Sequence, residues 1–206
     1  METYRPHLAY KGSRTYVHGT TLYQSILKGA AETGLGTPDG KIRIDLHKQL
    51  HRQADFVYLT PADDAGAPDD AVAAFTLGIG PDTVKGWVAP AGDEVTQSEP
   101  YDEDQILARA KITDQAISLK NAPGFDPIEV TTCLAVKIHN TLSPPPAGQK
   151  WLLARVTLAQ PFRDEDVRDI SLQVTRFVGG RFSETVIRRA GEKIGSFNFL
   201  LGAVSA

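Results

Sequence analysis

Apolar residues recur at every third or fourth position in residues 20–33 of the chain. This spacing predicts an amphipathic helix whose apolar stripe is made of Leu22, Tyr23, Ile26, Leu27 and Ala30. Thr20 is the expected N-cap, because a threonine side chain can accept a hydrogen bond from the first turn. Gly34, Gly36 and Gly40 follow and are expected to end the helix.

A second helix is predicted over residues 127–141. Asp126 is suited to the N-cap, and Pro127 suits the first helical position. Apolar side chains cover most of the circumference of this helix, which predicts that it is deeply buried. The prolines of Ser143-Pro144-Pro145-Pro146 are expected to end it.

Each predicted helix is followed by four segments of β-type composition. Residues 41–47 alternate apolar and polar side chains with a period of two, as a half-buried strand does. Gly179-Gly180 and Ala190-Gly191 are expected hairpin turns. The full set of predicted strands is 41–47, 55–60, 72–78 and 83–89 after the first helix, and 150–159, 169–177, 181–189 and 193–201 after the second.

The order and spacing of these elements repeat along the chain. The separation is 107 residues between the two helix starts, 20 and 127, and at most 114 between corresponding strands, 55 and 169. The sequence of one half shows little identity with that of the other. We therefore expect two halves, 1–104 and 105–206, packed as one pseudo-dimeric unit. The acidic, turn-rich stretch of residues 90–104 is the expected joint between them.

Composition and charge narrow the classes of function. The chain has 206 residues, 41% of them hydrophobic, and a net charge of −3 without a block of Lys or Arg, which argues against nucleic-acid binding. It has no apolar run of about 18 residues and no signal-peptide pattern, so we expect no membrane span and a cytoplasmic location. Cys133 is the only cysteine, which excludes an intrachain disulfide.

The arrangement of a strand at residues 8–17, His18-Gly19, a long helix and a further strand resembles the hot-dog fold. In that fold, a curled antiparallel sheet wraps a long helix. The second half, from Ala108 to Leu201, resembles another copy of it. The resemblance therefore implies an α+β double hot-dog, with two central helices that are each wrapped by a curled sheet.

The resemblance also implies a function. Hot-dog enzymes act on acyl groups carried by coenzyme A or acyl carrier protein, as thioesterases or as dehydratases and hydratases. Their thioester carbonyl lies at the start of the central helix, where free N–H groups and the helix dipole stabilise negative charge. We thus expect an acyl thioester as the substrate and acyl carrier protein as a possible partner. No cofactor and no metal ion are expected.

His18 and Gly19 stand directly before the first predicted helix. His18 resembles the histidine that dehydratase-type hot-dog proteins place ahead of the helix, so it is the candidate general base. Gly19 lets a ligand approach the backbone closely, and Gly19 and Thr20 are the expected substrate-binding residues here. The alternative is that His18 ends a strand and makes one structural hydrogen bond.

The approach to the second helix, residues 121–129, resembles the Asp…Asn-Pro-Ile-His loop of R-specific enoyl hydratases, with Asp114 as the early aspartate. Glu129 stands in the place of the histidine and Asp126 in that of the asparagine. Both are catalytic candidates, and Glu129 is a possible partner of His18. They also suit an N-cap and a first-turn carboxylate. Asn121 and Gly124 are the expected substrate-binding residues of this loop.

Other functions remain open. Asp45, His47 and His51 lie close together in sequence but do not form a convincing set of metal ligands, because His51 lies beyond a turn. The chain can instead be a non-catalytic hot-dog protein that binds a small acyl-type ligand or a protein partner. An acyl-transfer enzyme that resembles the A-factor synthesis family, and a β-sandwich or lipocalin-like barrel, are further alternatives. A homodimer is also possible.

Overall fold

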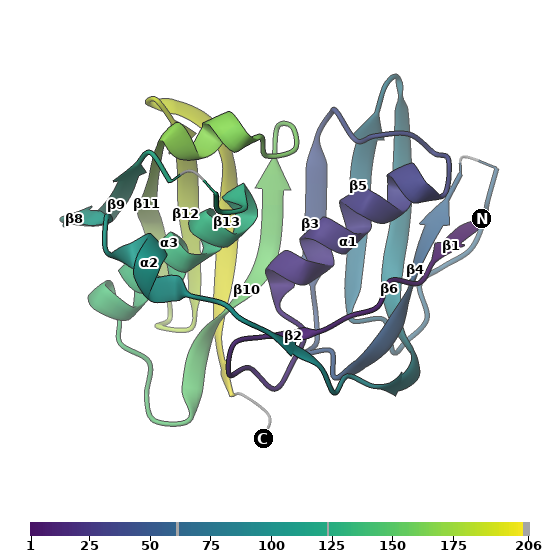
Figure 1. Cartoon of the computed structure of the whole chain (residues 1–206), viewed down its shortest axis with the longest axis horizontal. Coiled ribbons are helices and arrows are strands. Elements are labelled where there is room, and N and C mark those ends of the chain that lie inside the picture. The colour runs from purple at the N-terminus through teal and green to yellow at the C-terminus, as the bar shows by residue number, and fades with distance from the viewer. Residues whose placement is uncertain (61, 123, 204–206) are drawn as a thin grey trace. The chain divides into compact units, whose positions relative to one another are not determined.

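The computed structural model describes residues 1–60, 62–122 and 124–203 (Figure 1). The chain divides into two compact units. Unit 1 comprises Met1–Tyr101 with Ala159–Pro161, and unit 2 comprises Asp102–Leu158 with Phe162–Ala206. Each unit contains one long helix and an antiparallel sheet, and each is described below by itself.

In unit 1, helix α1 (Gly19–Glu32) lies against an antiparallel sheet and packs on its strands β1 and β4 (Figure 1). The apolar stripe predicted from the sequence faces the core, because Leu22, Tyr23 and Ile26 are all buried. A short parallel pair, β2 (Tyr10–Lys11) with β7 (Ser98–Glu99), stands apart from the sheet. Across the sheet the strands are β1 (Glu2–Tyr4), β4 (Arg52–Leu59), β6 (Asp82–Glu94), β5 (Ala73–Ile79) and β3 (Ile42–Leu46).

In unit 2, helix α3 (Pro127–Leu142) packs on strands β9, β10 and β11 and on the short helix α2 (Glu103–Leu107). Buried residues occur around most of α3, as the sequence predicts. A 3-10 helix, η1 (Asp164–Arg168), precedes β11. Across the sheet the strands are β8 (Lys111–Thr113), β9 (Ala116–Lys120), β11 (Asp169–Val178), β12 (Phe182–Arg189), β13 (Glu192–Ala203) and β10 (Gln149–Leu158).

The two units share the order of elements along the chain but not the order of strands across the sheet. In unit 2, the last three strands β11, β12 and β13 form a meander, and β10 pairs with β13. In unit 1, the hairpin of β5 and β6 has the opposite placement, with β6 next to β4 and β5 next to β3. The second half of the chain is therefore not a copy of the first in its strand pairing.

The predicted long elements are confirmed with small shifts of their ends. The helix predicted at residues 20–33 is α1, and the helix predicted at 127–141 is α3. The eight predicted strands are β3 to β6 and β10 to β13. The turn at Ala190-Gly191 is also confirmed, and both residues have positive φ, as a type I′ hairpin turn requires.

The strand predicted at residues 8–17 is wrong, since only Tyr10–Lys11 of this segment is extended in a ladder. The physical reason is that a side chain takes the place of a neighbouring strand. The amide of Gln53 accepts a hydrogen bond from Leu8 N at 2.8 Å and donates one to Leu8 O at 3.1 Å. The strand that pairs with β4 is β1, at the very start of the chain.

The stretch of residues 90–104 contains the boundary between the two units, at Tyr101 and Asp102. It also contains the end of β6, the strand β7 and the beginning of α2, a helix that the sequence did not predict. At the beginning of the second half, β8 and β9 form a hairpin. Asp114 lies exposed in the turn between them with φ of 50°. Its role there is conformational, because a short polar residue tolerates this backbone.

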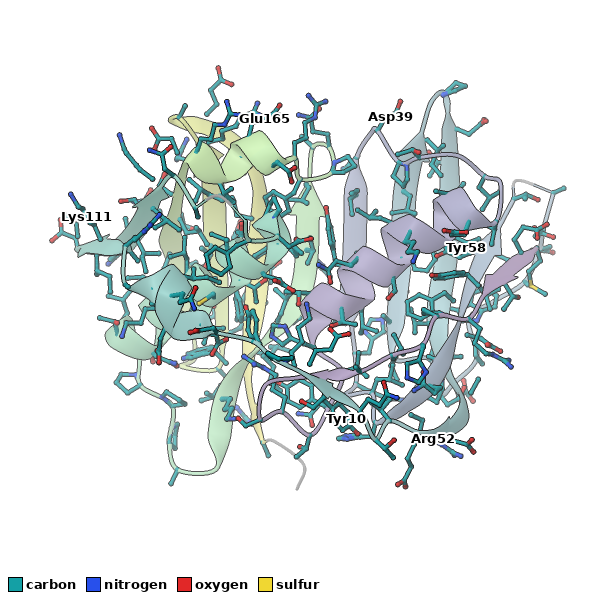
Figure 2. The ribbon with its side chains drawn as sticks, in the orientation of Figure 1. Tyr10, Asp39, Arg52, Tyr58, Lys111 and Glu165 are labelled. Carbon is teal, nitrogen blue, oxygen red and sulfur yellow. The ribbon has the colours of Figure 1, made fainter. Side chains whose placement is uncertain are left out.

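Tyr58 of β4 connects the sheet of unit 1 to α1 (Figure 2). Its hydroxyl donates a hydrogen bond to Ile26 O of the helix at 2.9 Å, and its ring packs on Phe75. Burial raises the pKa of Tyr58, so the hydroxyl keeps its proton and its donor role. Gly29 makes room for this contact: a Cβ at Gly29 would overlap the Tyr58 hydroxyl and would lie 2.6 Å from Tyr4 Cδ1.

His139 has a comparable role between α3 and the sheet of unit 2. Its Nδ1 lies 2.6 Å from Ala135 O and its Nε2 lies 2.5 Å from Ser183 Oγ of β12. Nδ1 therefore donates to the carbonyl, and the serine hydroxyl donates to Nε2. Burial lowers the pKa of His139, which favours this neutral form, and its ring packs on Trp151 and Phe199.

We predict that Gly29→Ala destabilises the protein, because the new methyl group overlaps Tyr58 and Tyr4 in a packed helix–sheet interface. Overpacking of this kind costs roughly 1–3 kcal/mol. The measurement is the midpoint of urea unfolding. Lys28→Ala, on the exposed side of the same helix, is the control and should change the stability by less than about 0.5 kcal/mol. Equal stability of the two variants would contradict the described contact.

Candidate functional site

His18 is the N-cap residue of α1, with φ of −68° and ψ of 145°. Its side chain makes no capping hydrogen bond, and the first turn of the helix contains no acidic residue. Leu22 N is the first amide to bond back, to His18 O at 3.2 Å. The amides of the first turn are thus left without a side-chain cap, although the helix dipole makes this end electropositive.

His18 is 7% exposed, and its imidazole is hydrogen-bonded to Thr20. Nδ1 lies 2.8 Å from Thr20 Oγ1, and the ring packs 5.9 Å from the ring of Tyr101, measured between centroids. Within the described parts of the chain, Nε2 has no hydrogen-bond partner. The prediction of Thr20 as N-cap is wrong, because the N-cap is His18, two residues earlier. The Thr20 hydroxyl bonds to His18 instead.

Two cationic side chains lie beside the same tyrosine ring. Arg14 Cζ is 5.1 Å and Lys11 Nζ is 5.8 Å from the centroid of Tyr101. Lys11 is 6% exposed, and its ammonium donates a hydrogen bond to Gln24 Oε1 of α1 at 3.3 Å. Two cationic side chains of unit 1 therefore lie near His18.

Burial lowers the pKa of His18 well below its usual range, and the positive charges of Arg14 and Lys11 lower it further. The imidazole is thus neutral at neutral pH. The Thr20 hydroxyl can accept the Nδ1 proton, which leaves the lone pair on Nε2, or donate to Nδ1, which leaves the proton on Nε2. His18 has the protonation state that a general base needs.

Thr21 is a polar residue of this region that the sequence analysis did not single out. Its hydroxyl is buried in the first turn of α1 and has no hydrogen-bond partner among the described residues. The sequence carried no signal for it, because the unbonded state of a hydroxyl depends on burial in the folded chain.

The start of α3 differs from that of α1 because carboxylates occupy it. Asp126 is the N-cap, as predicted, and its Oδ1 accepts a hydrogen bond from Ile128 N at 3.0 Å. Pro127 occupies the first turn, also as predicted, and the half-buried Glu129 lies in that turn as well. Because capping satisfies one of the first amides and two carboxylates add negative charge, this end is less suited to binding an anion.

The two substrate-binding candidates before α3 lie in a loop. Asn121 is exposed with φ of 56°, and its carbonyl accepts a hydrogen bond from Arg109 Nη1 at 3.1 Å. Gly124 is exposed with φ of 85°. Pro123, between them, lies outside the described residues. The structure gives both candidates a backbone role, and their contact with a substrate stays a prediction.

His18, Gly19 and Thr20 belong to unit 1, whereas Glu129 and Asp126 belong to unit 2. The pairing of His18 with Glu129 therefore stays a prediction. Of the weak metal candidates, Asp45 bonds to Arg43 Nε at 2.7 Å, and His51 Nδ1 lies 2.7 Å from Thr15 O. The described residues contain no cluster of three or more metal-ligating side chains. Among the same residues, no helix combines the length and apolar character that a membrane span needs.

The chain is similar to several solved structures. A tesB protein from Mycobacterium avium subspecies paratuberculosis shares 10% identity, with a TM-score of 0.52 and coverage of 98% of this chain and 92% of that one. A hot-dog-fold protein of unknown function from Alicyclobacillus acidocaldarius shares 10% identity, with a TM-score of 0.47 and coverage of 99% and 93%. The PpsC dehydratase domain from Mycobacterium tuberculosis, in complex with C12:1-CoA, shares 14% identity, with a TM-score of 0.46 and coverage of 98% and 93%.

These likenesses concern the fold. The chain shares its fold with the tesB protein, and no particular family is identified. No family model matches the chain, and the search of curated proteins gave no match.

We predict that Asp126→Ala destabilises unit 2 by about 1 kcal/mol, because it removes the oxygen that caps α3. Asp126→Asn keeps a capping oxygen and should stay within a few tenths of the original stability. The measurement is thermal unfolding of both variants beside the unchanged protein. An Asn variant as unstable as the Ala variant would show that the charge of Asp126, and not its capping bond, is what stabilises the helix start.

Proposed function

We propose that this chain binds an acyl thioester of coenzyme A or acyl carrier protein at the start of α1, and that His18 is the general base. One observation carries the proposal: a buried, neutral histidine with an unbonded Nε2 stands directly before a helix start that no side chain caps. The fold adds support, since hot-dog proteins with this architecture handle acyl thioesters.

The first-turn amides of α1 would bind the thioester carbonyl oxygen, and Gly19 would allow the backbone to approach it. For hydrolysis, His18 Nε2 takes a proton from water as the water oxygen attacks the carbonyl carbon. The negative charge then rests on the carbonyl oxygen beside the helix start. When the carbon–sulfur bond breaks, His18 returns the proton to the thiolate. Arg14 and Lys11 assist by favouring negative charge nearby.

The same base serves the second form of the proposal, a dehydratase or hydratase reaction. There, His18 removes a proton from the carbon next to the thioester carbonyl, and the helix start stabilises the resulting enolate. A carboxylic acid is then needed to protonate the departing hydroxyl group. The catalytic role of Asp126 and Glu129, and the substrate-binding role of Asn121 and Gly124, stay predictions from the sequence.

We further propose that the two units form a double hot-dog. Each unit has a long helix on an antiparallel sheet, with the same element order along the chain. Gly86 of β6 and Gly195 of β13 lie 109 residues apart, from 86 to 195. At both positions a Cβ would collide with a carbonyl oxygen of the neighbouring strand, Val57 O and Thr157 O respectively. The different strand order of unit 1 implies that the units diverged in their pairing.

The alternative is a hot-dog protein that binds an acyl-type ligand without catalysis. The observation that favours it is the second helix start, where Glu129 replaces the histidine of enoyl hydratases and Asp126 is engaged as a cap. In this alternative, the start of α1 binds the thioester and no reaction follows.

We predict that acyl-CoA thioesters stabilise the protein and that the protein releases free thiol from them. At 100 times its dissociation constant, a ligand that binds only the native state adds about 2.7 kcal/mol to the free energy of unfolding. His18→Gln should reduce thiol release by roughly 10²- to 10⁴-fold, because it removes the general base. The measurements are the melting temperature and the rate of thiol release, with free coenzyme A and acyl-pantetheine as controls.

Each result separates one form of the proposal from the others. Stabilisation with thiol release supports a thioesterase, while stabilisation with water addition or loss on an enoyl or hydroxyacyl thioester supports a hydratase or dehydratase. Stabilisation without any turnover supports the non-catalytic alternative. No response to any thioester, on coenzyme A or on acyl carrier protein, would refute thioester binding.

We predict that Thr20→Val reduces turnover by about 3- to 10-fold, the equivalent of one hydrogen bond, whereas Thr20→Ser retains most of it. The proposed role of His18 requires that the Thr20 hydroxyl accepts the Nδ1 proton, because only this tautomer has its lone pair on Nε2. The valine variant loses that acceptor. The direct measurement is the nitrogen-15 spectrum of the His18 ring, which distinguishes the two tautomers.

The pH profile is a second measurement on the same residue. His18 acts in its neutral form and its pKa is lowered, so turnover should be constant at neutral pH and fall only below pH 6.5 as the ring takes up a proton. An acidic limb at or above pH 6.5 would show that His18 is not the base.

A further inference from the structure

We propose that a second copy of this chain packs on the face of the unit 2 sheet that α3 does not cover, hereafter the outer face. Helix α3 lies on the other face of the same sheet (Figure 1). This pairing of two chains requires neither His18 nor a thioester, and so goes beyond the proposed function. The first observation is that apolar side chains on the outer face are exposed to solvent.

His139 of α3 identifies the two faces of the sheet. It bonds to Ser183 of β12, and its ring packs on Phe199 of β13 at 4.6 Å and on Phe177 of β11 at 5.9 Å, measured between centroids. It also packs on Trp151 of β10 at 5.3 Å. These four residues therefore face α3. Because neighbouring side chains of a strand point to opposite faces, the residues next to them lie on the outer face.

A row of four apolar residues, the apolar row, crosses the outer face from β10 to β11. Each member is the neighbour in sequence of one α3-facing residue, and successive members are paired in register. Their order across the sheet is Leu152, Leu200, Phe182 and Val178. Leu200 is 46% exposed and Val178 is 41% exposed. Contact of such a continuous row with water costs free energy that a packed partner recovers.

Unit 1 uses its own chain to bury apolar side chains on the corresponding face. Tyr58 bonds to α1, so its neighbour Val57 points to the other face, where it is paired with Trp87. Ala71, from the segment between β4 and β5, packs in the same cluster, and Trp87 is 8% exposed. In unit 2 the connection that matches this segment in chain order joins β11 to β12 and comprises residues 179–181 alone. A connection this short cannot fold back over the sheet, which leaves the apolar row for another molecule to cover.

The charged residues beside the apolar row indicate that this molecule is a second copy of the chain. Arg176 of β11 and Glu184 of β12 are cross-strand partners, and each is adjacent to an α3-facing residue, so both side chains lie on the outer face. Within the described part of the chain, neither of them makes an ion pair. A two-fold axis that runs between β11 and β12, parallel to them, places each residue opposite its own cross-strand partner in the other copy. Arg176 of each copy then faces Glu184 of the other, and two ion pairs form.

The same axis brings apolar residues together and sets no like charges against each other. Phe182 lies opposite Val178 of the second copy, and Leu200 lies at the edge of the contact. Further along the two strands, the outward pairs that face each other are Val186 with Gln173 and Arg188 with Ser171. Two sheets can pack in this way at a distance of about 10 Å, with interdigitating side chains. The outer face is therefore complementary to itself in charge and in apolar surface.

The experiment measures the mass of the full chain by sedimentation equilibrium over the micromolar range of concentration. Because only the outward side chains of a few strands take part, we expect a reversible dimer with a dissociation constant in that range. Arg176→Glu places two carboxylates opposite each other at both contacts and should raise the dissociation constant roughly 10- to 100-fold. Glu184→Arg should do the same. When the two variants are mixed in equal amounts, the dimer should return, because each supplies the charge that the other lacks.

Two further variants complete the test. Val178→Asp places a charge opposite Phe182 of the second copy and should also weaken the dimer. Lys137→Glu is the matched control, since it reverses a charge of the same sign on the exposed side of α3 and should leave the dissociation constant unchanged. Circular dichroism of each variant distinguishes a lost dimer from a lost fold, and a dimer that returns on mixing shows that both charge variants are folded.

A monomer throughout the micromolar range would overturn the proposal and leave the outer face to a different protein. A dimer that withstands both charge reversals, or that Lys137→Glu weakens as much as Arg176→Glu does, would place the contact elsewhere and overturn it as well. Loss of the dimer in both charge variants without its return on mixing would contradict the two-fold axis between β11 and β12. Thioester binding by a monomer would leave the proposed function standing while this pairing fails.

Discussion

The candidate site depends on how α1 packs against the sheet of unit 1. Tyr58 reaches from β4 to the Ile26 carbonyl, and Gly29 leaves the space for its ring. This one hydrogen bond lies inside a packed interface, so it fixes both the depth and the register of the helix. Because a helix is stiff, fixing its middle also fixes the positions of His18 and Thr21 at its start. A polar contact in the core thus sets the geometry of groups two turns away.

The starts of α1 and α3 differ in how their first-turn backbone amides are capped. At α3, Asp126 caps the helix and Glu129 adds a second carboxylate, which stabilises the fold and leaves little capacity for an anion. At α1, the N-cap residue is a histidine that makes no cap, and Thr21 keeps a hydroxyl unbonded. The N-cap hydrogen bond that stabilises the start of α3 is therefore missing at the start of α1. Such local deficits are typical of sites that complete their bonding with a ligand.

The sequence predicted the long elements well, because helix and strand periods are set by neighbours along the chain. The stripe of α1 and the Asp126-Pro127 start of α3 are local signals, and both were correct. Helix α2 was missed although Asp102 and Gln105 form a capping pair, with Gln105 N bonded to Asp102 Oδ1 at 3.1 Å. His18 was found from its position, but its partner Thr20 was misassigned. The unbonded state of Thr21 depends on tertiary burial, which no local pattern records.

The position of the β5–β6 hairpin in the sheet of unit 1 affects how the chain folds. In unit 2, β11, β12 and β13 pair in sequence order, so three strands can assemble from local turns before β10 joins. In unit 1, only β5 and β6 are neighbours in both sequence and space, and a lone hairpin is barely stable in water. Its sheet must grow outward on both sides, by β3 and β4 docking from more distant sequence. We expect unit 1 to fold more slowly than unit 2.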